Sequence, residues 1–313
     1  MAIIIDENVT RKLINMPRAI KLVEDIFRDR AAGKVRSFPR LRLKGSEKQL
    51  NVMAAWQQTS DLICLRSYAG EANTVTLYNG RTGRIQAIVN MAYLSSLRTG
   101  AASGVAARYL APANSPVMGL IGPGWQATFQ VEAIAHSCPV RQILVFGRDP
   151  KKARKFISAM RKSVQAEWKE AASVEEVEAG SDIFVLATDS SAPVAFGTKL
   201  KDEVLVISMG ANQPVKHEVS VELVRNMDLI VTDDLATAQN DSGDLIAACG
   251  AGILRWDDVV PLEKIVVGEM AEDRPKKILF QSNGIADEDL AVGRYVFEQV
   301  KKKRIKARKI SEI

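Results

Sequence analysis

Residues 117–127 of this chain read Val117-Met118-Gly119-Leu120-Ile121-Gly122-Pro123-Gly124-Trp125-Gln126-Ala127, an apolar run that enters a glycine turn and leaves it as a helix. The first glycine allows a sharp turn, and the second leaves room for a pyrophosphate to approach the backbone. Free N–H groups at the start of the helix favour anionic phosphates. Such turns also occur without a ligand, but here we expect a dinucleotide site. The residues expected to contact the cofactor are Gly122, Gly124, Trp125, Gln126 and Ala127.

Further apolar runs follow the turn at 142–146 and 182–187, and the stretch from Lys151 to Met160 has a helical pattern. Two more runs, at 204–210 and 227–234, are also typical of buried strands. Strands that alternate with helices indicate a parallel sheet with right-handed crossovers. The sequence therefore predicts an α/β fold with a Rossmann-type, doubly wound parallel sheet.

The N-terminal third has a different pattern. Its first 30 or so residues look helical, with Ile20, Val23 and Ile26 at helical spacing. Candidate strands follow at 38–43, 51–56 and 62–68, and 73–89 has the pattern of a hairpin with an Asn- and Gly-rich turn. A run of small residues after Arg98 suits a tightly packed helix over 91–110. These patterns predict a smaller α+β domain.

Composition excludes several classes of protein. At 313 residues the chain suggests two domains. No apolar run approaches the roughly 20 residues that span a membrane, and the N-terminus does not resemble a secretory signal. The three cysteines, Cys64, Cys138 and Cys249, fit neither a disulfide framework nor a zinc site. Two histidines are too few for a histidine-based metal site. We therefore expect a cytoplasmic protein without a metal.

The net charge of +6 arises from one segment. Seven basic residues lie between positions 301 and 309, and the 43 basic residues less these seven leave 36 against 37 acidic ones. A charge run of this kind is usually a solvated helix face or tail. We therefore expect neither a nucleic-acid nor a membrane partner, although binding of an acidic partner by this tail remains the minority alternative.

Ligands of doubly wound folds gather outside the carboxyl ends of the parallel strands. Thr188 follows the strand expected at 182–187, and Met209, Gly210 and Asn212 lie at or just beyond the end of the strand expected at 204–210. Thr188, Met209 and Gly210 are therefore candidate cofactor-binding residues, although a single residue at such a place more often belongs to an ordinary turn or helix cap.

The end of the second strand bears on which nicotinamide nucleotide is used. NAD enzymes place an acid roughly 20 residues past the turn, where it binds the ribose hydroxyls. Here Gly147 stands at that place and Arg148 follows it, with Lys151 and Lys152 nearby. Space and positive charge suit a 2′-phosphate, so we expect NADP, with NAD as the alternative. Asp149 is a counter-signal, unless it caps the next helix.

Taken together, these motifs resemble the ornithine cyclodeaminase/mu-crystallin family over nearly the whole chain. The most specific pieces are residues 98–104, the turn at 122–127, Gly243-Asp244-Leu245 and residues 280–290. The resemblance implies a Rossmann domain over 113–290 and a substrate-binding and dimerisation domain made of 1–112 and 291–313. It also implies a homodimer that transfers hydride between a nicotinamide and the α carbon of a small amino or imino acid.

The resemblance also carries individual residues over. Arg40 and Arg98 match the carboxylate-binding arginines of the family, and arginine supplies paired donors to a carboxylate. Met53 is assigned to substrate binding, and Thr99 matches a position that meets the cofactor.

Two residues depart from the family pattern. Arg66 stands where the family commonly has a lysine, and arginine is a poor general acid. Asn212 stands where the cyclodeaminase has an aspartate, and asparagine cannot take up a proton. Both remain candidate catalytic residues, and Arg66 could also bind substrate. The changes favour a cyclic ketimine reductase or an amino-acid dehydrogenase such as alanine dehydrogenase. Ornithine cyclodeaminase and a catalytically weak, nucleotide-dependent binding protein stay open as alternatives.

Overall fold

The computed structural model describes residues 2–269 and 274–310, and the chain divides into two compact units. Unit 1 comprises Met1–Thr99 and Gly284–Ile313, and unit 2 comprises Gly100–Asn283. The divisions therefore fall at other residues than the expected 112 and 290. The reason is that helix α3 (Ala92–Leu110) runs unbroken through Thr99 and Gly100, so that one helix belongs to both units.

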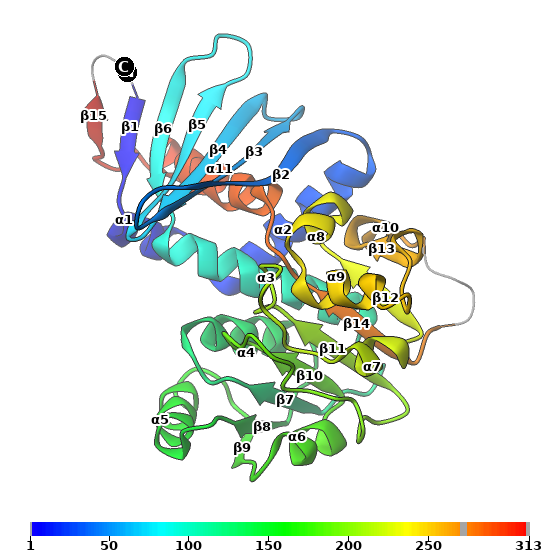
Figure 1. Cartoon of the computed structure of the whole chain (residues 1–313). Coiled ribbons are helices and arrows are strands. Elements are labelled where there is room, and N and C mark those ends of the chain that lie inside the picture. Colours follow the sequence, from blue (N-terminus) through cyan, green and yellow to red (C-terminus); the bar gives the residue numbers. More distant parts are fainter. Residues whose placement is uncertain (1, 270–273, 311–313) are drawn as a thin grey trace. The chain divides into compact units, whose positions relative to one another are not determined.

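Unit 1 is built on a seven-stranded sheet in the order β15-β1-β6-β5-β4-β3-β2 (Figure 1). β1 pairs in parallel with β6, and all other neighbours are antiparallel. Helix α11 packs on β2 to β6, and α2 packs on α11. The strands are β1 (Ala2–Ile5), β2 (Val35–Lys44), β3 (Gln49–Gln57), β4 (Leu62–Ala69), β5 (Ala72–Asn79), β6 (Ile85–Asn90) and β15 (Arg308–Ile310), and the helices are α1 (Glu7–Leu13), α2 (Met16–Ala31) and α11 (Ala286–Lys302).

The N-terminal segment is only partly the helix that its periodicity predicts. Helix α2 is confirmed: Asn15 caps it by accepting from the Arg18 N–H, and its apolar residues are buried on one side. The expectation of helix was wrong for Ala2–Ile5, which form strand β1. That run of β-branched residues has no helical period, and its partners β6 and β15 lie far along the chain.

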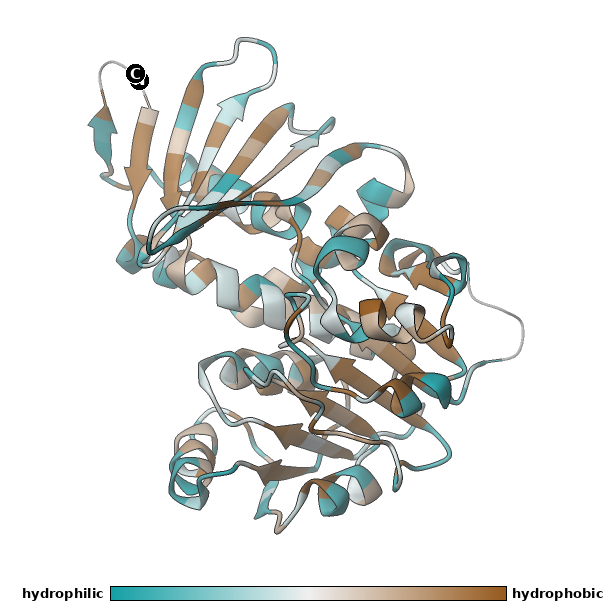
Figure 2. Cartoon of the chain, in the orientation of Figure 1, coloured by the Kyte–Doolittle hydropathy of each residue, from teal (hydrophilic) through white to brown (hydrophobic). Residues whose placement is uncertain are grey.

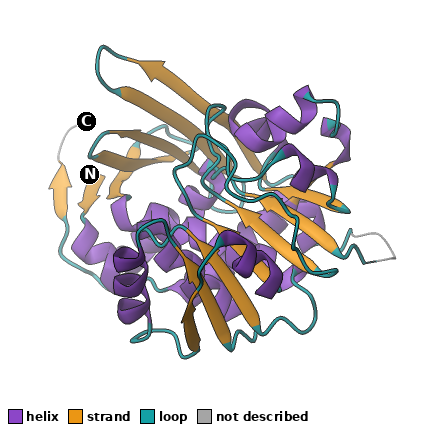
Figure 3. Ribbon diagram, turned by 60° about the horizontal axis from the view of Figure 1, so that its bottom comes forward, coloured by secondary structure: helices purple, strands orange, loops and turns teal. Residues whose placement is uncertain are grey.

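Unit 2 contains an eight-stranded, wholly parallel sheet in the order β13-β12-β14-β11-β10-β7-β8-β9, with helices on both faces (Figure 3). The expected Rossmann-type sheet is confirmed. Its strands are β7 (Val117–Ile121), β8 (Gln142–Phe146), β9 (Glu167–Glu170), β10 (Ile183–Leu186), β11 (Val204–Ser208), β12 (Leu229–Thr232), β13 (Val259–Pro261) and β14 (Lys277–Gln281). Its helices after α3 are α4 (Trp125–Ser137), α5 (Pro150–Met160), α6 (Val174–Gly180), α7 (Val221–Arg225), α8 (Leu235–Asp241), α9 (Gly243–Gly250) and α10 (Leu262–Val266), with a 3-10 turn at Trp256–Asp258.

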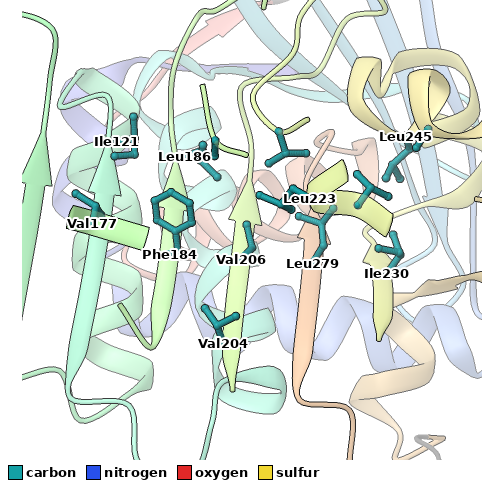
Figure 4. Packing of buried hydrophobic residues seen from close by; sticks show 14 of the residues in the cluster. Ile121, Val177, Phe184, Leu186, Val204, Val206, Leu223, Ile230, Leu245 and Leu279 are labelled. Carbon is teal, nitrogen blue, oxygen red and sulfur yellow. The ribbon is translucent and has the colours of Figure 1, made fainter. Parts of the chain in front are cut away.

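The core of unit 2 explains why its strands are continuous apolar runs. Ile121, Leu186, Val206 and Leu279 point to one face of the sheet, and Leu223 of α7 packs over them (Figure 4). Because helices cover the other face as well, the strands are hydrophobic along most of their length (Figure 2).

The strand order places the glycine turn at a topological switch point. β8 and β9 lie on one side of β7, whereas β10 and all later strands of the sheet lie on the other. Crossovers therefore diverge at the carboxyl end of β7, which is where open α/β sheets bind ligands. Over the described residues, no helix is both long and apolar enough to cross a bilayer.

Candidate functional site

The turn after β7 has the geometry that a pyrophosphate requires. Gly122 has a φ of 87°, and a Cβ there would lie 2.6 Å from the carbonyl oxygen of Ala187. Gly124 is the N-cap residue of α4, and no side chain caps that helix end. A Cβ on Gly124 would meet nothing within 4 Å. The first position therefore demands glycine, and the second leaves the N–H groups of α4 open to an anion.

A cavity of about 870 Å³ opens at this turn. It brings together four of the predicted cofactor-binding residues, namely Gly122, Gly124, Arg148 and Thr188. Asp149, Asp189 and Ser190 also line it, and apolar side chains form most of the remaining wall, including Phe196, which is 54% exposed. A mostly apolar cleft with a few polar groups is typical of a cofactor site.

The other predicted residues of the turn do not line this cavity. Trp125 is exposed and packs edge-on against Phe129, with 5.3 Å between ring centroids. Ala127 is fully buried, as close packing of a helix on a sheet requires. Gln126 follows Trp125 in the first turn of α4 and is half-buried.

Arg148 and Lys152 place two cations on the cavity wall beyond β8. Asp149 lies between them in the chain, and its carboxylate accepts from the backbone N–H groups of Lys151 at 2.9 Å and Lys152 at 3.4 Å. The interpretation of Asp149 as the N-cap of α5 is therefore confirmed.

In unit 1, Arg98 is held by two buried carboxylates of α11. Its Nε donates to Asp289 Oδ1 at 2.9 Å, and its Nη1 donates to Glu288 Oε2 at 2.8 Å. Burial alone would lower the pKa of Arg98, but attraction by Asp289 and Glu288 outweighs burial and raises that pKa. The guanidinium is therefore a fixed, permanent positive charge.

Arg40 and Arg98 meet at Gly284. Arg40 Nη2 donates to the Gly284 carbonyl oxygen at 3.0 Å, and a Cβ on Gly284 would lie 2.4 Å from Arg98 Nη1. Both arginines are buried, at 7% and 5% exposure. The structure thus brings the two expected carboxylate-binding arginines together, and a side chain at position 284 would displace the guanidinium of Arg98.

Arg66 lies on strand β4, against which helix α11 packs. It is 2% exposed, and its Nη1 donates to the carbonyl oxygens of Ser67 and Thr74 at 3.2 and 3.3 Å. Its Nε is 3.3 Å from Asp289 Oδ2. Burial lowers the pKa of Arg66, although Asp289 counteracts this. Met53, directly opposite Arg66 in the β3–β4 ladder, is buried with it.

The remaining predicted residues lie on helix α3 and on the loop after β11. Thr99 is buried in unit 1, and its hydroxyl donates to the Ser95 carbonyl oxygen at 2.8 Å. Met209 and Gly210 are buried directly after β11 in unit 2, and Asn212 is half-buried two residues later. The predicted residues thus form two sets, one in each unit.

Sequence reasoning did not assign the acidic partners of these residues. Glu288 and Asp289 in unit 1, and Glu218 and Asp244 in unit 2, are at most 1% exposed. The signal was present, because Asp244 and the α11 acids lie within motifs already recognised as specific. Within the described ranges, no group of His, Cys, Asp or Glu could hold a metal ion.

Comparison of the sequence with known proteins gives matches over nearly the whole chain. A sequence model of the ornithine cyclodeaminase/mu-crystallin family matches residues 2–304. An alanine dehydrogenase of Archaeoglobus fulgidus is 30% identical over 97% of this chain and 96% of its own length.

Two solved structures are similar over nearly their whole length. Thermococcus litoralis Δ1-pyrroline-2-carboxylate reductase, in complex with NADH and L-proline, has a TM-score of 0.92 and 27% identity, over 98% of this chain and 100% of that one. An archaeal alanine dehydrogenase dimer with bound NAD has a TM-score of 0.90 and 29% identity, over 99% of both chains.

Proposed function

The chain belongs to the ornithine cyclodeaminase/mu-crystallin family, and on that premise we propose that it is a nicotinamide-dependent oxidoreductase of small amino or imino acids. Hydride would pass to or from the α carbon of the substrate. The observation that carries the proposal is the meeting of buried Arg40 and Arg98 at Gly284, in a chain that also has the open glycine turn at the switch point.

Each unit contributes a distinct part of the chemistry. The N–H groups at the start of α4 bind the pyrophosphate, and the bound nicotinamide supplies or accepts the hydride. Arg98 and Arg40 hold the substrate carboxylate and so orient its α carbon. Arg98 keeps its charge throughout, because its pKa is raised.

The groups available for proton transfer limit which reactions the site can catalyse. Arg66 stays protonated near neutral pH, and Asn212 has no ionisable group, so neither can exchange a proton with the substrate nitrogen. Water or the substrate's own nitrogen then carries the proton. This supports a cyclic ketimine reductase or an amino-acid dehydrogenase such as alanine dehydrogenase over ornithine cyclodeamination.

For the cofactor we propose NADP. Arg148 and Lys152 line the cavity beyond β8, where a 2′-phosphate would lie. Asp149 also lines the cavity, but its Oδ1 is engaged in capping α5. NAD is the alternative, and the two similar structures contain NADH and NAD.

We also propose a homodimer. Phe38, Leu41 and Leu43 on strand β2 are 51%, 62% and 69% exposed, an apolar surface that a second copy would cover. The similar archaeal alanine dehydrogenase is a dimer.

Turnover of purified protein tests the proposal. With NADPH and Δ1-pyrroline-2-carboxylate, or with pyruvate and ammonia, we expect loss of the reduced-nicotinamide absorbance and formation of proline or alanine. Proline formed from ornithine with NAD would instead identify a cyclodeaminase. Nucleotide binding without any turnover would identify the binding protein and contradict the proposed activity.

A further inference from the structure

The carboxylate of Glu218 ties together the chain segments that follow β10 and β11. Its Oε1 accepts from the Thr188 N–H at 2.6 Å and from the Thr188 hydroxyl at 2.8 Å. Its Oε2 accepts from the N–H groups of Met209 at 3.0 Å and Gly210 at 2.6 Å, and from the Ser208 hydroxyl at 2.9 Å. One fully buried side chain therefore satisfies five donors from two strand ends.

Asp244, at the start of α9, contacts both the backbone of Glu218 and the Ser208 hydroxyl. Its Oδ1 accepts from the Glu218 N–H at 3.0 Å, and its Oδ2 lies 3.0 Å from Ser208 Oγ. His217 Nδ1 is 3.7 Å from Asp244 Oδ1. The Ser208 hydroxyl thus has a carboxyl oxygen of Glu218 on one side and one of Asp244 on the other, both within hydrogen-bond distance.

This arrangement requires one more proton than two ionised carboxylates supply. A serine hydroxyl carries a single hydrogen and can donate to only one of the two oxygens. If both acids were ionised, the carboxylate that receives no hydrogen bond from Ser208 would have its oxygen facing a lone pair of the Ser208 hydroxyl. Two buried negative charges would also lie close together. A proton on Asp244 Oδ2 removes the conflict, because Asp244 then donates to Ser208, which donates to Glu218.

The surroundings place the proton on Asp244. Glu218 accepts three backbone N–H bonds, whereas Asp244 accepts two, from Glu218 and Val219, and such bonds favour the ionised form of a carboxyl group. Burial and then repulsion by Glu218 raise the pKa of Asp244 to about 7. Burial also raises the pKa of Glu218, as expected for two acids that compete for one proton.

We propose that a hydrogen-bond relay, in which protonated Asp244 donates to Ser208 and Ser208 donates to Glu218, holds the ends of β10 and β11 in the nucleotide-binding conformation. Glu218 and Asp244 are then positioning residues. The inference rests on the proposed function, because Thr188, Met209 and Gly210 are the residues that the sequence predicts to bind the nucleotide. Thr188 also lines the cavity at the glycine turn.

The relay gives nucleotide binding a defined pH dependence. Glu218 and His217 face Asp244 directly, and the elements packed against α9 add other ionisable groups: the Glu222–Arg225 ion pair of α7, and Asp234 and Asp241 of α8. Because the folded-state pKa of Asp244 is raised, the relay is intact below about 7 and is lost as the pH rises through that value. Loss of one hydrogen bond corresponds to about a fivefold weaker affinity.

Asp244→Asn tests the relay, because its amide can donate to Ser208 and accept from the Glu218 N–H as protonated Asp244 does. From about pH 6 to about pH 8.5, we expect the NADPH affinity of the wild type to fall about fivefold and that of Asp244→Asn to stay at the low-pH value. In Glu218→Gln, the side-chain NH₂ group would face backbone N–H donors in place of a carboxylate oxygen. This variant should therefore bind NADPH about tenfold more weakly throughout this range. Glu222→Gln, an exposed change on α7, should match the wild type.

The same pH dependence in wild type and Asp244→Asn would contradict the relay. Carbon NMR of the Asp244 carboxyl in the wild type provides a second test that does not depend on any variant. We expect that carboxyl to titrate near neutral pH, and titration in the ordinary acidic range of an aspartate would overturn the proposal. A wild type that binds no nicotinamide nucleotide at any pH would refute the proposed function, whereas the NMR titration would still report on the proton.

Discussion

Arg98 is fixed before any substrate arrives, because α11 supplies two carboxylates at 2.8 and 2.9 Å. A guanidinium anchored in this way loses little conformational freedom when it binds a third carboxylate, which is the advantage of a preorganised site. The same ion pairs make Arg98 part of the core of unit 1. Its role in substrate binding and its role in stability are therefore not separable by a simple truncation.

Arg148 offers a cleaner test at the level of one residue, because it is exposed on the cavity wall. We expect Arg148→Ala to weaken NADPH binding about 10- to 100-fold, as loss of a charge-assisted bond to a 2′-phosphate would. NADH binding should change by about twofold or less. Fluorescence titration of both nucleotides measures the difference.

Arg154→Ala is the matched control for this prediction. This substitution removes the same charge from helix α5, which follows Arg148 in the chain. The Arg154 guanidinium, however, pairs with Glu170 at 3.3 Å. The substitution should leave both affinities unchanged. An equal loss of NADPH and NADH binding in Arg148→Ala would refute the assignment of NADP.

At this scale the sequence predicted residue types better than their partners. Arg40, Arg66 and Arg98 were identified from their motifs, but Glu288 lies 190 positions from Arg98 and only the fold brings them together. Arg66 shows the same limit. Its position in the motif made it a candidate catalytic and substrate-binding residue, but its partners, which are backbone carbonyls and Asp289, are visible only in the structure.

Helix α5 carries a prediction about stability. Asp149 caps its N-terminus, so Asp149→Ala should lower the free energy of unfolding by about 1 kcal/mol. Asp149→Asn keeps an N-cap acceptor and should stay within a few tenths of a kcal/mol of the wild type. Chemical denaturation followed by circular dichroism measures both. Equal losses in the two variants would show that charge, and not capping, is what Asp149 contributes.

The elements that sequence predicted well are those with a strong local signal. β7, β8, β10 and β11 are apolar runs bounded by polar residues or glycine, and α2 has a clear helical period. Short edge strands escaped prediction because pairing with distant segments creates them. β15 is the clearest case: three residues of the basic tail become a strand only by pairing with β1.

At the scale of the whole molecule, the alternation of strands and helices was enough to predict the parallel sheet, whereas the switch point became visible only with the strand order. The division into units was harder, since α3 carries the chain across the boundary without a turn.

The proposed homodimer is tested by the surface of β2. Leu43 is 69% exposed, and Leu43→Glu places a charge on this apolar surface, so we expect it to shift the protein from dimer to monomer in sedimentation velocity. Val215→Glu, at a residue of unit 2 with the same 69% exposure, should leave the dimer intact. A dimer that persists in Leu43→Glu would exclude this surface as the interface.

Transfer of isotope tests the central claim most directly. The purified protein would be given reduced nicotinamide nucleotide carrying deuterium at the transferable position of its ring, together with a cyclic ketimine carboxylate or with a 2-oxo acid and ammonia. Mass spectrometry and NMR would then locate the label in the amino acid that forms. Hydride transfer to the α carbon predicts deuterium on the α carbon of that product, whereas an unlabelled α carbon, or no product with any of these substrates, would contradict the proposed reaction.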